Sequence, residues 1–63
     1  MTLTITIDLD NAVFEVDPGY EAAAILRAVA DNIVASPQLR PGMVLTPPMD
    51  SNGNTVGTVK VAP

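Results

Sequence analysis

The chain has 63 residues, of which 48% are hydrophobic and 16% are charged, and its formal net charge is −4. This length gives one domain with a small core, and the apolar content argues against general disorder. Cysteine and histidine are both absent, which removes disulfides, thiolate metal sites and imidazole-based acid–base chemistry, while the acidic balance opposes binding to nucleic acid.

The chain shows no pattern of membrane attachment. Its longest apolar stretch, residues 22–34, is too short to span a bilayer and is interrupted by Arg27 and Asp31. The first residues alternate between apolar and polar and lack the basic start of a signal peptide. We therefore expect a cytoplasmic protein.

Residues 2–10 carry the clearest strand pattern. Apolar and polar side chains alternate strictly, as in a β-strand with one buried face. The face expected to be buried holds Leu3, Ile5, Ile7 and Leu9, and the opposite face holds Thr2, Thr4, Thr6, Asp8 and Asp10.

A helix is expected from residue 18 to about residue 35. Asp17 is a favourable N-cap, Pro18 suits the first helical position, and Glu21 places a negative charge near the positive end of the helix dipole. Ser36-Pro37 marks the end of the helix. The expected central stripe is Ala22, Leu26, Val29 and Ile33, widened by Ile25 and Ala30.

The last third of the chain predicts a β-hairpin. Asn52-Gly53 is the dipeptide that a two-residue type I′ turn prefers. With that turn, Val56 lies on the opposite face from Val59 and Val61 unless one extra residue is inserted between them. We therefore expect a β-bulge at Gly57-Thr58. Pro47-Pro48 belongs at an edge, because proline donates no backbone hydrogen bond. The hairpin residues expected to reach the core are Met43, Leu45, Pro47, Met49, Val56, Val59 and Val61.

The predicted fold is α+β, a single β-α-β-β domain over residues 1–63 with one amphipathic helix packed on a three-stranded sheet. A right-handed strand–helix–strand crossover makes the first two strands parallel. The last strand then fits between them, which gives the order 1-3-2 and leaves the first strand at an edge.

No catalytic, cofactor or metal site is expected. Asp8 and Asp10 have calcium-like spacing, but Ala12 stands where a third ligand belongs and no glycine makes the turn. Residues 50–54 have ligand spacing too, but Thr55 stands where a calcium loop needs glycine and Val61 where it needs a bidentate glutamate. A phosphate-binding loop needs glycines between the end of a strand and the start of a helix. The glycines of this hairpin are not in such a position. One tyrosine and one phenylalanine leave little to line an active site.

The candidate binding residues lie on the edge strand and in an acidic cluster. A strand without proline, lysine or a bulge lacks the usual protection against pairing with another chain. The alternative is a monomer in which residues 11–16 cover this edge. The acidic cluster is either a patch for a basic partner or a solvated surface that keeps the domain soluble. The candidates are Thr2, Thr4, Thr6, Asp8, Asp10, Glu15, Asp17 and Glu21.

Three segments together resemble a family of short uncharacterised proteins encoded by bacteriophages and prophages. The segments are Ile5-Thr6-Ile7-Asp8-Leu9-Asp10-Asn11-Ala12, then Ala24-Ile25-Leu26-Arg27 followed by Ala30-Asp31, and Asp50-Ser51-Asn52-Gly53-Asn54-Thr55-Val56-Gly57. Members usually have an aliphatic residue near position 51, where this chain has serine, and a shorter, less proline-rich loop than residues 36–48. The resemblance implies a phage or prophage origin and an accessory role, and it assigns no activity to any residue.

We therefore expect a non-catalytic protein that binds a host or phage protein, inhibition of a host defence system being one specific form. The alternative is a structural part, a homo-oligomeric virion or assembly component. The first strand could also pair two copies into a homodimer. A regulator that touches nucleic acid is a third class, which the charge opposes.

Overall fold

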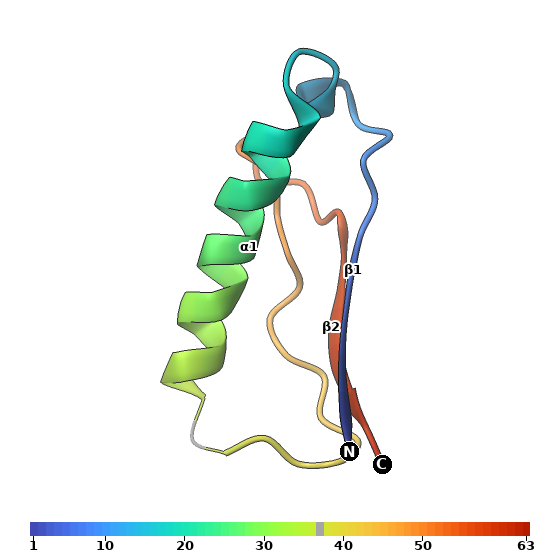
Figure 1. Cartoon of the computed structure of the whole chain (residues 1–63), viewed down its shortest axis with the longest axis vertical. Coiled ribbons are helices and arrows are strands. Elements are labelled where there is room, and N and C mark those ends of the chain that lie inside the picture. Colours follow the sequence, from blue (N-terminus) through green and yellow to red (C-terminus); the bar gives the residue numbers. More distant parts are fainter. Residues whose placement is uncertain (37) are drawn as a thin grey trace.

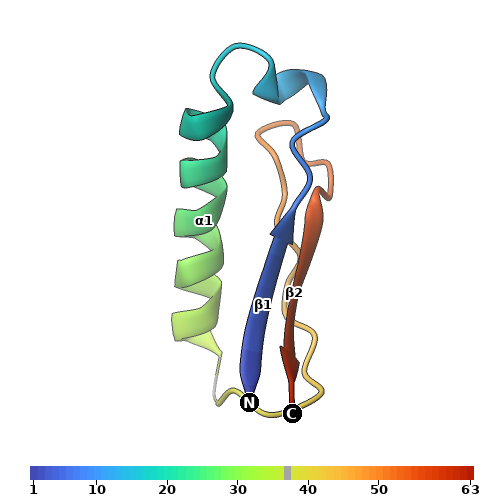
Figure 2. The ribbon, with the colours of Figure 1, turned by 45° about the vertical axis from the view of Figure 1, so that its right-hand side comes forward.

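The computed structural model describes residues 1–36 and 38–63. In chain order its elements are β1 (Thr2–Ile7), the short 3₁₀ helix η1 (Ala12–Phe14), α1 (Pro18–Ala35) and β2 (Gly57–Ala62). Figure 1 and Figure 2 show two layers along the long axis: α1 forms one, and β1 with β2 forms the other. The molecule measures 36 × 19 × 17 Å.

The helix begins and ends as the sequence predicts. The Asp17 carboxylate accepts a hydrogen bond from the backbone N–H of Tyr20 at 3.0 Å, and Pro18 opens the helix. At the other end the Ser36 N–H donates to the Ile33 carbonyl at 3.1 Å, so Ser36 is the C-cap. Pro37, the other half of the expected stop, lies outside the described residues.

The buried stripe of α1 is rotated from the expected one. Ile25 and Val29 are buried, with Ile33 packed beside them, whereas Leu26 is 45% exposed. The prediction that Leu26 belongs to the centre of the stripe is therefore wrong. The centre of the stripe lies between Ile25 and Ile33, and Leu26 forms one of its flanks.

The sheet has two antiparallel strands. Leu3 lies opposite Val61, Ile5 opposite Val59, and Ile7 opposite Gly57. The predicted three-stranded sheet of order 1-3-2 is wrong, because residues 43–49 form no strand. They contact β2 through isolated bridges, Val44 with Lys60 and Met49 with Thr55. Proline explains this result, since Pro47 and Pro48 donate no hydrogen bond and leave the pairing interrupted.

The hairpin turn is longer than predicted. The Asp50 N–H donates to the Asn54 carbonyl at 2.9 Å, and the Gly53 N–H donates to the Asp50 carbonyl at 3.0 Å, so the loop holds three residues. Gly53 has φ of +83°, but no non-glycine residue has positive φ among the described residues. A type I′ turn needs positive φ at both central positions, so that prediction is wrong. The loop is a type I turn followed by a left-handed glycine.

The predicted bulge at Gly57-Thr58 is also wrong. The same number of residues separates Val44 from Met49 as separates Thr55 from Lys60, so no extra residue is inserted between the two bridges. Gly57 instead lies opposite Ile7 inside β2. A Cβ at Gly57 would overlap the Thr6 carbonyl oxygen and lie 2.7 Å from the Thr6 carbonyl carbon, so glycine is required by the close approach of β1.

The core is small and lies at the end of the molecule that holds η1. Its buried members are Phe14, Ile25, Val29, Val56 and Val59, with Val61 buried further along β2. Among the residues before the turn that were expected to reach the core, Leu45 packs against the core. Pro47 and Met49 are exposed, and Pro48 is buried instead. The shorter predicted turn explains these errors, because it placed the wrong residues of the two arms opposite each other.

Candidate protein-binding surface

β1 has a strand neighbour on one side only among the described residues. Its partner is β2, and residues 43–45 bond to the far edge of β2. The alternative, in which residues 11–16 cover the edge, is not what the structure shows. Those residues form η1 and a turn beyond the end of β1, over the start of α1 (Figure 1), and Thr2–Thr6 are exposed.

The hydrogen bonds of β2 identify which backbone groups of β1 point outward. On its far edge, the Val61 N–H donates to the Met43 carbonyl and the Val59 carbonyl accepts from the Leu45 N–H, both at 2.9 Å. In an antiparallel ladder successive residues bond to opposite sides. Thr58, Lys60 and Ala62 therefore bond to β1, in agreement with the bond from the Asp8 N–H to the Val56 carbonyl at 2.6 Å.

It follows that the threonines of β1 are the residues whose backbone bonds to β2. Thr2, Thr4 and Thr6 are their register partners. The outward-pointing N–H and C=O groups belong to the residues between them, which are Leu3, Ile5 and Ile7. The sequence analysis named the threonines as candidate residues of the edge strand without saying which backbone groups of that strand point outward. Only the pairing with β2 reveals which set faces outward, so the sequence alone held no signal for it.

We call the backbone groups of Leu3, Ile5 and Ile7 the free edge. The free edge borders an apolar strip that lacks a cover. Ile5 is 37% exposed and Leu3 is 38% exposed, although their cross-strand partners Val59 and Val61 are buried. Partners in register share one face of a sheet, so all four side chains point toward α1. The β1 side of this face is therefore open.

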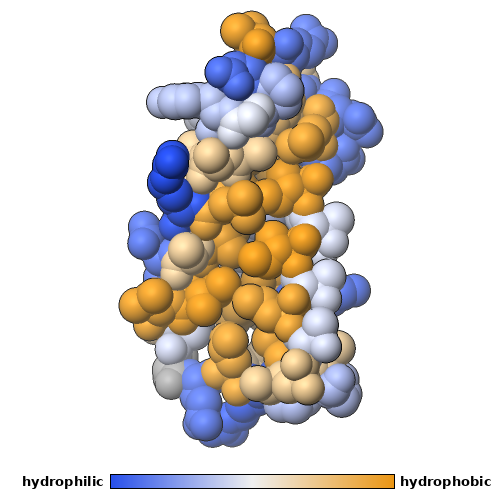
Figure 3. Space-filling view, viewed as in Figure 1, coloured by the Kyte–Doolittle hydropathy of each residue, from blue (hydrophilic) through white to orange (hydrophobic). Residues whose placement is uncertain are grey.

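The helix contributes the other wall of this strip. Residues Glu21, Ala24 and Ala28 of α1 lie against the hairpin turn. At 100° per residue Leu26 lies on the opposite flank of the helix, toward β1. Figure 3 shows apolar side chains gathered in a band between α1 and the strands. We call the partly exposed side chains of Leu3, Ile5, Leu9 and Leu26 the open face.

The predicted acidic residues gather at one end of the molecule but are not one free patch. Asp8 and Asp10 follow β1, and Glu15, Asp17 and Glu21 surround the start of α1 (Figure 1). Several of them have structural partners: Asp17 caps α1, and Glu21 accepts a hydrogen bond from the Ser51 hydroxyl at 3.3 Å. The cluster gives this end of the molecule its negative charge, and Asp17 and Glu21 also have structural roles.

Asp8 and Asp10 influence each other directly. The Asp8 carboxylate accepts a hydrogen bond from the Asp10 N–H at 3.0 Å. The Asp8 side chain raises the pKa of Asp10 above its ordinary value, first through a side-chain hydrogen bond and then through like charge. The pair is thus a place where carboxylates repel each other.

Asp50 organises the hairpin turn through its carboxylate. It is buried, and its carboxylate accepts from the backbone N–H groups of Asn52 and Asn54, both at 2.9 Å. The Asn11 side-chain amide donates to it at 2.7 Å, which ties the turn to the segment before η1. The Asn54 backbone hydrogen bond is the main cause that holds the pKa of Asp50 below its ordinary value.

A hollow of about 150 Å³ lies between α1 and the turn, lined mainly by apolar atoms. Within residues 1–36 and 38–63, no three acidic, histidine or cysteine side chains gather closely enough to hold a metal ion. Over the same residues, no helix has both the length and the apolar character needed to cross a bilayer. The arrangement chiefly offers a strand edge beside an apolar strip.

Comparison with protein-family models, with curated proteins and with solved structures finds no match to this chain. The resemblance to phage and prophage proteins therefore stays a prediction.

Proposed function

We propose that this chain is a non-catalytic protein-binding domain that accepts a strand of another protein chain on the free edge of β1. The observation that carries the proposal is the unequal burial of Ile5 and Val59, which are 37% and 1% exposed although they are partners on one face of the sheet. A strand added beside β1 would bond to the outward groups of Leu3, Ile5 and Ile7 and cover the open face.

This mode of binding suits a domain of this size. Main-chain hydrogen bonds supply affinity, while the open face selects apolar side chains on the incoming strand. A two-stranded sheet is at best marginally stable alone in water, so a further strand would also stabilise the fold. The resemblance to phage and prophage proteins, if it holds, implies an accessory role inside an infected cell, and inhibition of a host protein is one such role.

Site-specific photo-crosslinking in a bacterial host tests the proposal. A photo-reactive amino acid at Thr4 lies on the exposed face of β1, beside the free edge. The same group at Arg27, exposed on the opposite side of α1 from the core, is the matched control. We expect a protein adduct from position 4 and none from position 27. Equal adducts from both positions, or none from position 4, would contradict the proposal.

The structural alternative, a homo-oligomeric virion or assembly component, is favoured by one observation, the regular alternation of threonine and aliphatic residues along β1. The mass of the position 4 adduct identifies the partner: twice the mass of this chain shows self-pairing, and any other mass shows a second protein. Self-pairing is compatible with both functions, so the content of purified virions separates them. Purified virions that contain the chain at a fixed ratio would favour the structural function.

A further inference from the structure

We propose that the strand accepted by the free edge is β1 of a second copy of this chain, antiparallel, with a two-fold axis passing between the two Ile5 residues. This inference rests on the proposed function, because it uses the same edge. It adds the identity of the partner and the register of the pairing.

The register follows from the backbone. Strands pair only where outward-pointing groups meet outward-pointing groups, and on this edge those groups belong to Leu3, Ile5 and Ile7. Pairing Ile5 with Ile5 of the partner subunit also pairs Leu3 with Ile7 of the partner subunit. Every outward group of β1 then has a partner. A shift by one residue would bring inward groups to the edge and satisfy none of them.

The side chains of β1 are self-complementary in this register. About Ile5, the sequence reads nearly the same in both directions, with aliphatic residues at odd positions and polar residues at even positions. Thr4 therefore lies opposite Thr6 of the partner subunit on the outer face. On the inner face Leu3, Ile5 and Ile7 from both copies form one continuous apolar surface.

The two-fold axis also brings the helices together. An axis perpendicular to the sheet keeps both α1 helices on the same side of the enlarged sheet. Leu26 lies roughly 14 Å from the C-terminal end of α1, and Ile5 lies roughly 10 Å from the start of β1, at the same end of the molecule (Figure 2). In Figure 2 α1 ends above the start of β1, so Leu26 lies further from this end of the molecule than Ile5 does, and its exposed side chain lies on the flank of α1 that faces β1 and the partner subunit.

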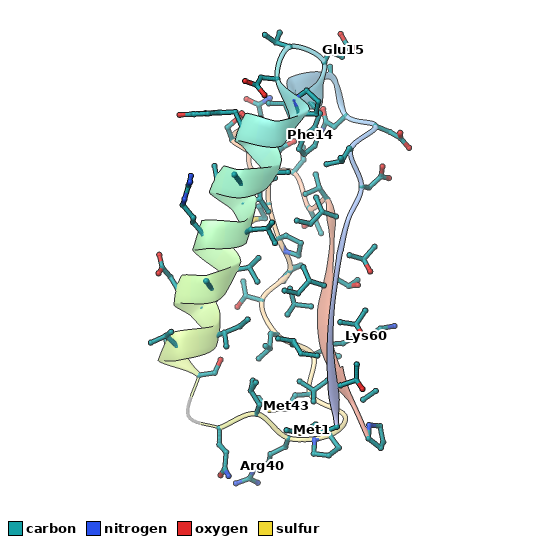
Figure 4. All side chains as sticks on the ribbon, in the orientation of Figure 1. Met1, Phe14, Glu15, Arg40, Met43 and Lys60 are labelled. Atoms are coloured by element: carbon teal, nitrogen blue, oxygen red, sulfur yellow. The ribbon has the colours of Figure 1, made fainter. Side chains whose placement is uncertain are left out.

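Charge favours the antiparallel arrangement over a parallel one. Carboxylates gather at the end that holds Glu15, whereas Arg40 lies at the opposite end (Figure 4). An antiparallel pair brings the acidic end of each copy toward the Arg40 end of the other, and Asp8 lies opposite Thr2 of the partner subunit. A parallel pair would set Asp8 beside Asp8 in a chain whose net charge is already −4.

Self-pairing would add buried surface to a domain that has little. In this register the two copies overlap over roughly 20 Å, the length of the paired strands, which is less than the 36 Å length of the molecule, so the interface is a small one. The chain has no cysteine and so no disulfide, and a second copy would supply extra burial that a domain this small needs.

Disulfide trapping tests the partner and the register together. Directly opposite residues that do not exchange hydrogen bonds have Cα atoms about 4.5 Å apart, which a disulfide spans. In the proposed register Thr4 faces Thr6 of the partner subunit in this way, while two Thr4 residues are about 8 Å apart, too far for a disulfide. Both positions are exposed in the monomer, and no native cysteine competes.

The experiment mixes T4C with T6C under mild oxidation and compares the mixture with each variant alone and with R27C. We expect at least tenfold more disulfide-linked dimer in the mixture than in any single variant. Equal crosslinking by T4C alone would overturn the register, and crosslinking no greater than that of R27C would overturn the dimer. A monomeric chain that still gives an adduct with another protein from position 4 would overturn this inference while supporting the proposed function.

Discussion

Ile5 of β1 lies directly opposite Val59 of β2, yet the two side chains differ sharply in burial, with Ile5 37% and Val59 1% exposed. Neighbours in register on one face of a sheet normally share the same cover. Here α1 covers β2 and leaves the β1 side open, with Leu3 and Leu26 also partly exposed. This unequal cover is the reason for placing the binding surface at β1.

Substitution of Ile25 and of Leu26, which are adjacent in α1, should separate core packing from binding. Ile25 is 4% exposed, so Ile25→Ala should lower the free energy of unfolding by about 2–5 kcal/mol. Leu26→Ala should cost about 1 kcal/mol or less in the monomer, because the side chain is already 45% exposed. Urea denaturation at low protein concentration measures both values.

The same pair should behave differently as concentration rises. If Leu26 packs at a dimer interface, the wild-type midpoint should rise with protein concentration and that of Leu26→Ala should rise less. A Leu26→Ala variant as unstable as Ile25→Ala at low concentration would show that Leu26 belongs to the core of the monomer and would contradict the open face.

Gly57 should tolerate no side chain. A Cβ there would overlap the Thr6 carbonyl, so Gly57→Ala should push β1 away from β2 and lower stability by about 3 kcal/mol or more. Gly19→Ala is the control, because its Cβ would lie 3.7 Å from the nearest atom, an Asp17 carboxylate oxygen. Thermal unfolding followed by circular dichroism should show a large loss for the first and little change for the second. Similar losses for both would refute the close approach of the strands.

Asp50 should make stability fall in acid. Its pKa is lowered in the folded state, chiefly by the Asn54 backbone N–H, so its contribution is complete above the unfolded pKa of about 3.9 and is lost as the pH falls through the lower folded value. Asp50→Asn should be less stable at pH 7, since its amide would face the donating amide of Asn11, 2.7 Å from the carboxylate in the native chain. The melting temperature of Asp50→Asn should also depend less on pH than that of wild type between about pH 5 and pH 2, roughly the range in which such carboxylates titrate. Parallel pH profiles of the two proteins would argue against this role.

Asp10 should act in the opposite direction. Because Asp8 raises the pKa of Asp10 in the folded state, the ionised pair destabilises the fold at neutral pH, and stability recovers as the pH falls from the raised value toward about 3.9. Asp10→Asn should therefore melt at a higher temperature than wild type at pH 7, and the difference should shrink in acid. A lower melting temperature for Asp10→Asn at pH 7 would contradict this reading of the carboxylate pair.

The parts of the fold that the sequence predicts well are those that depend on local chemistry. Asp17 and Pro18 start α1 through contacts within one turn, and the alternation over residues 2–7 makes a strand whatever its partner is. The turn depends on more than its dipeptide. The buried Asp50 carboxylate holds the N–H groups of Asn52 and Asn54, which favours the three-residue loop over the predicted two-residue one.

The position of the free edge depends on pairing between segments far apart in the sequence. The sequence therefore predicts the strand but not which of its backbone N–H and C=O groups point outward. Which residues of β1 point outward is decided by the bonds of Val59 and Val61 to residues 43–45, far away in sequence. The exposure of Leu26 likewise follows from the width of the sheet. Because residues 43–49 pack on the β2 side, no segment of the described residues extends the sheet beyond β1 to cover that flank of α1.

The most direct test is amide hydrogen exchange of β1, followed by NMR while the protein concentration is raised from about 10 μM to about 1 mM, a range that spans micromolar to millimolar dissociation constants. The Thr4 and Thr6 amides bond to β2 and should be protected throughout. The Ile5 amide should exchange freely in dilute protein and slow at least tenfold as β1 pairs with a second copy. Fast exchange at Ile5 throughout this range, with Thr4 and Thr6 still protected, would contradict pairing of the free edge.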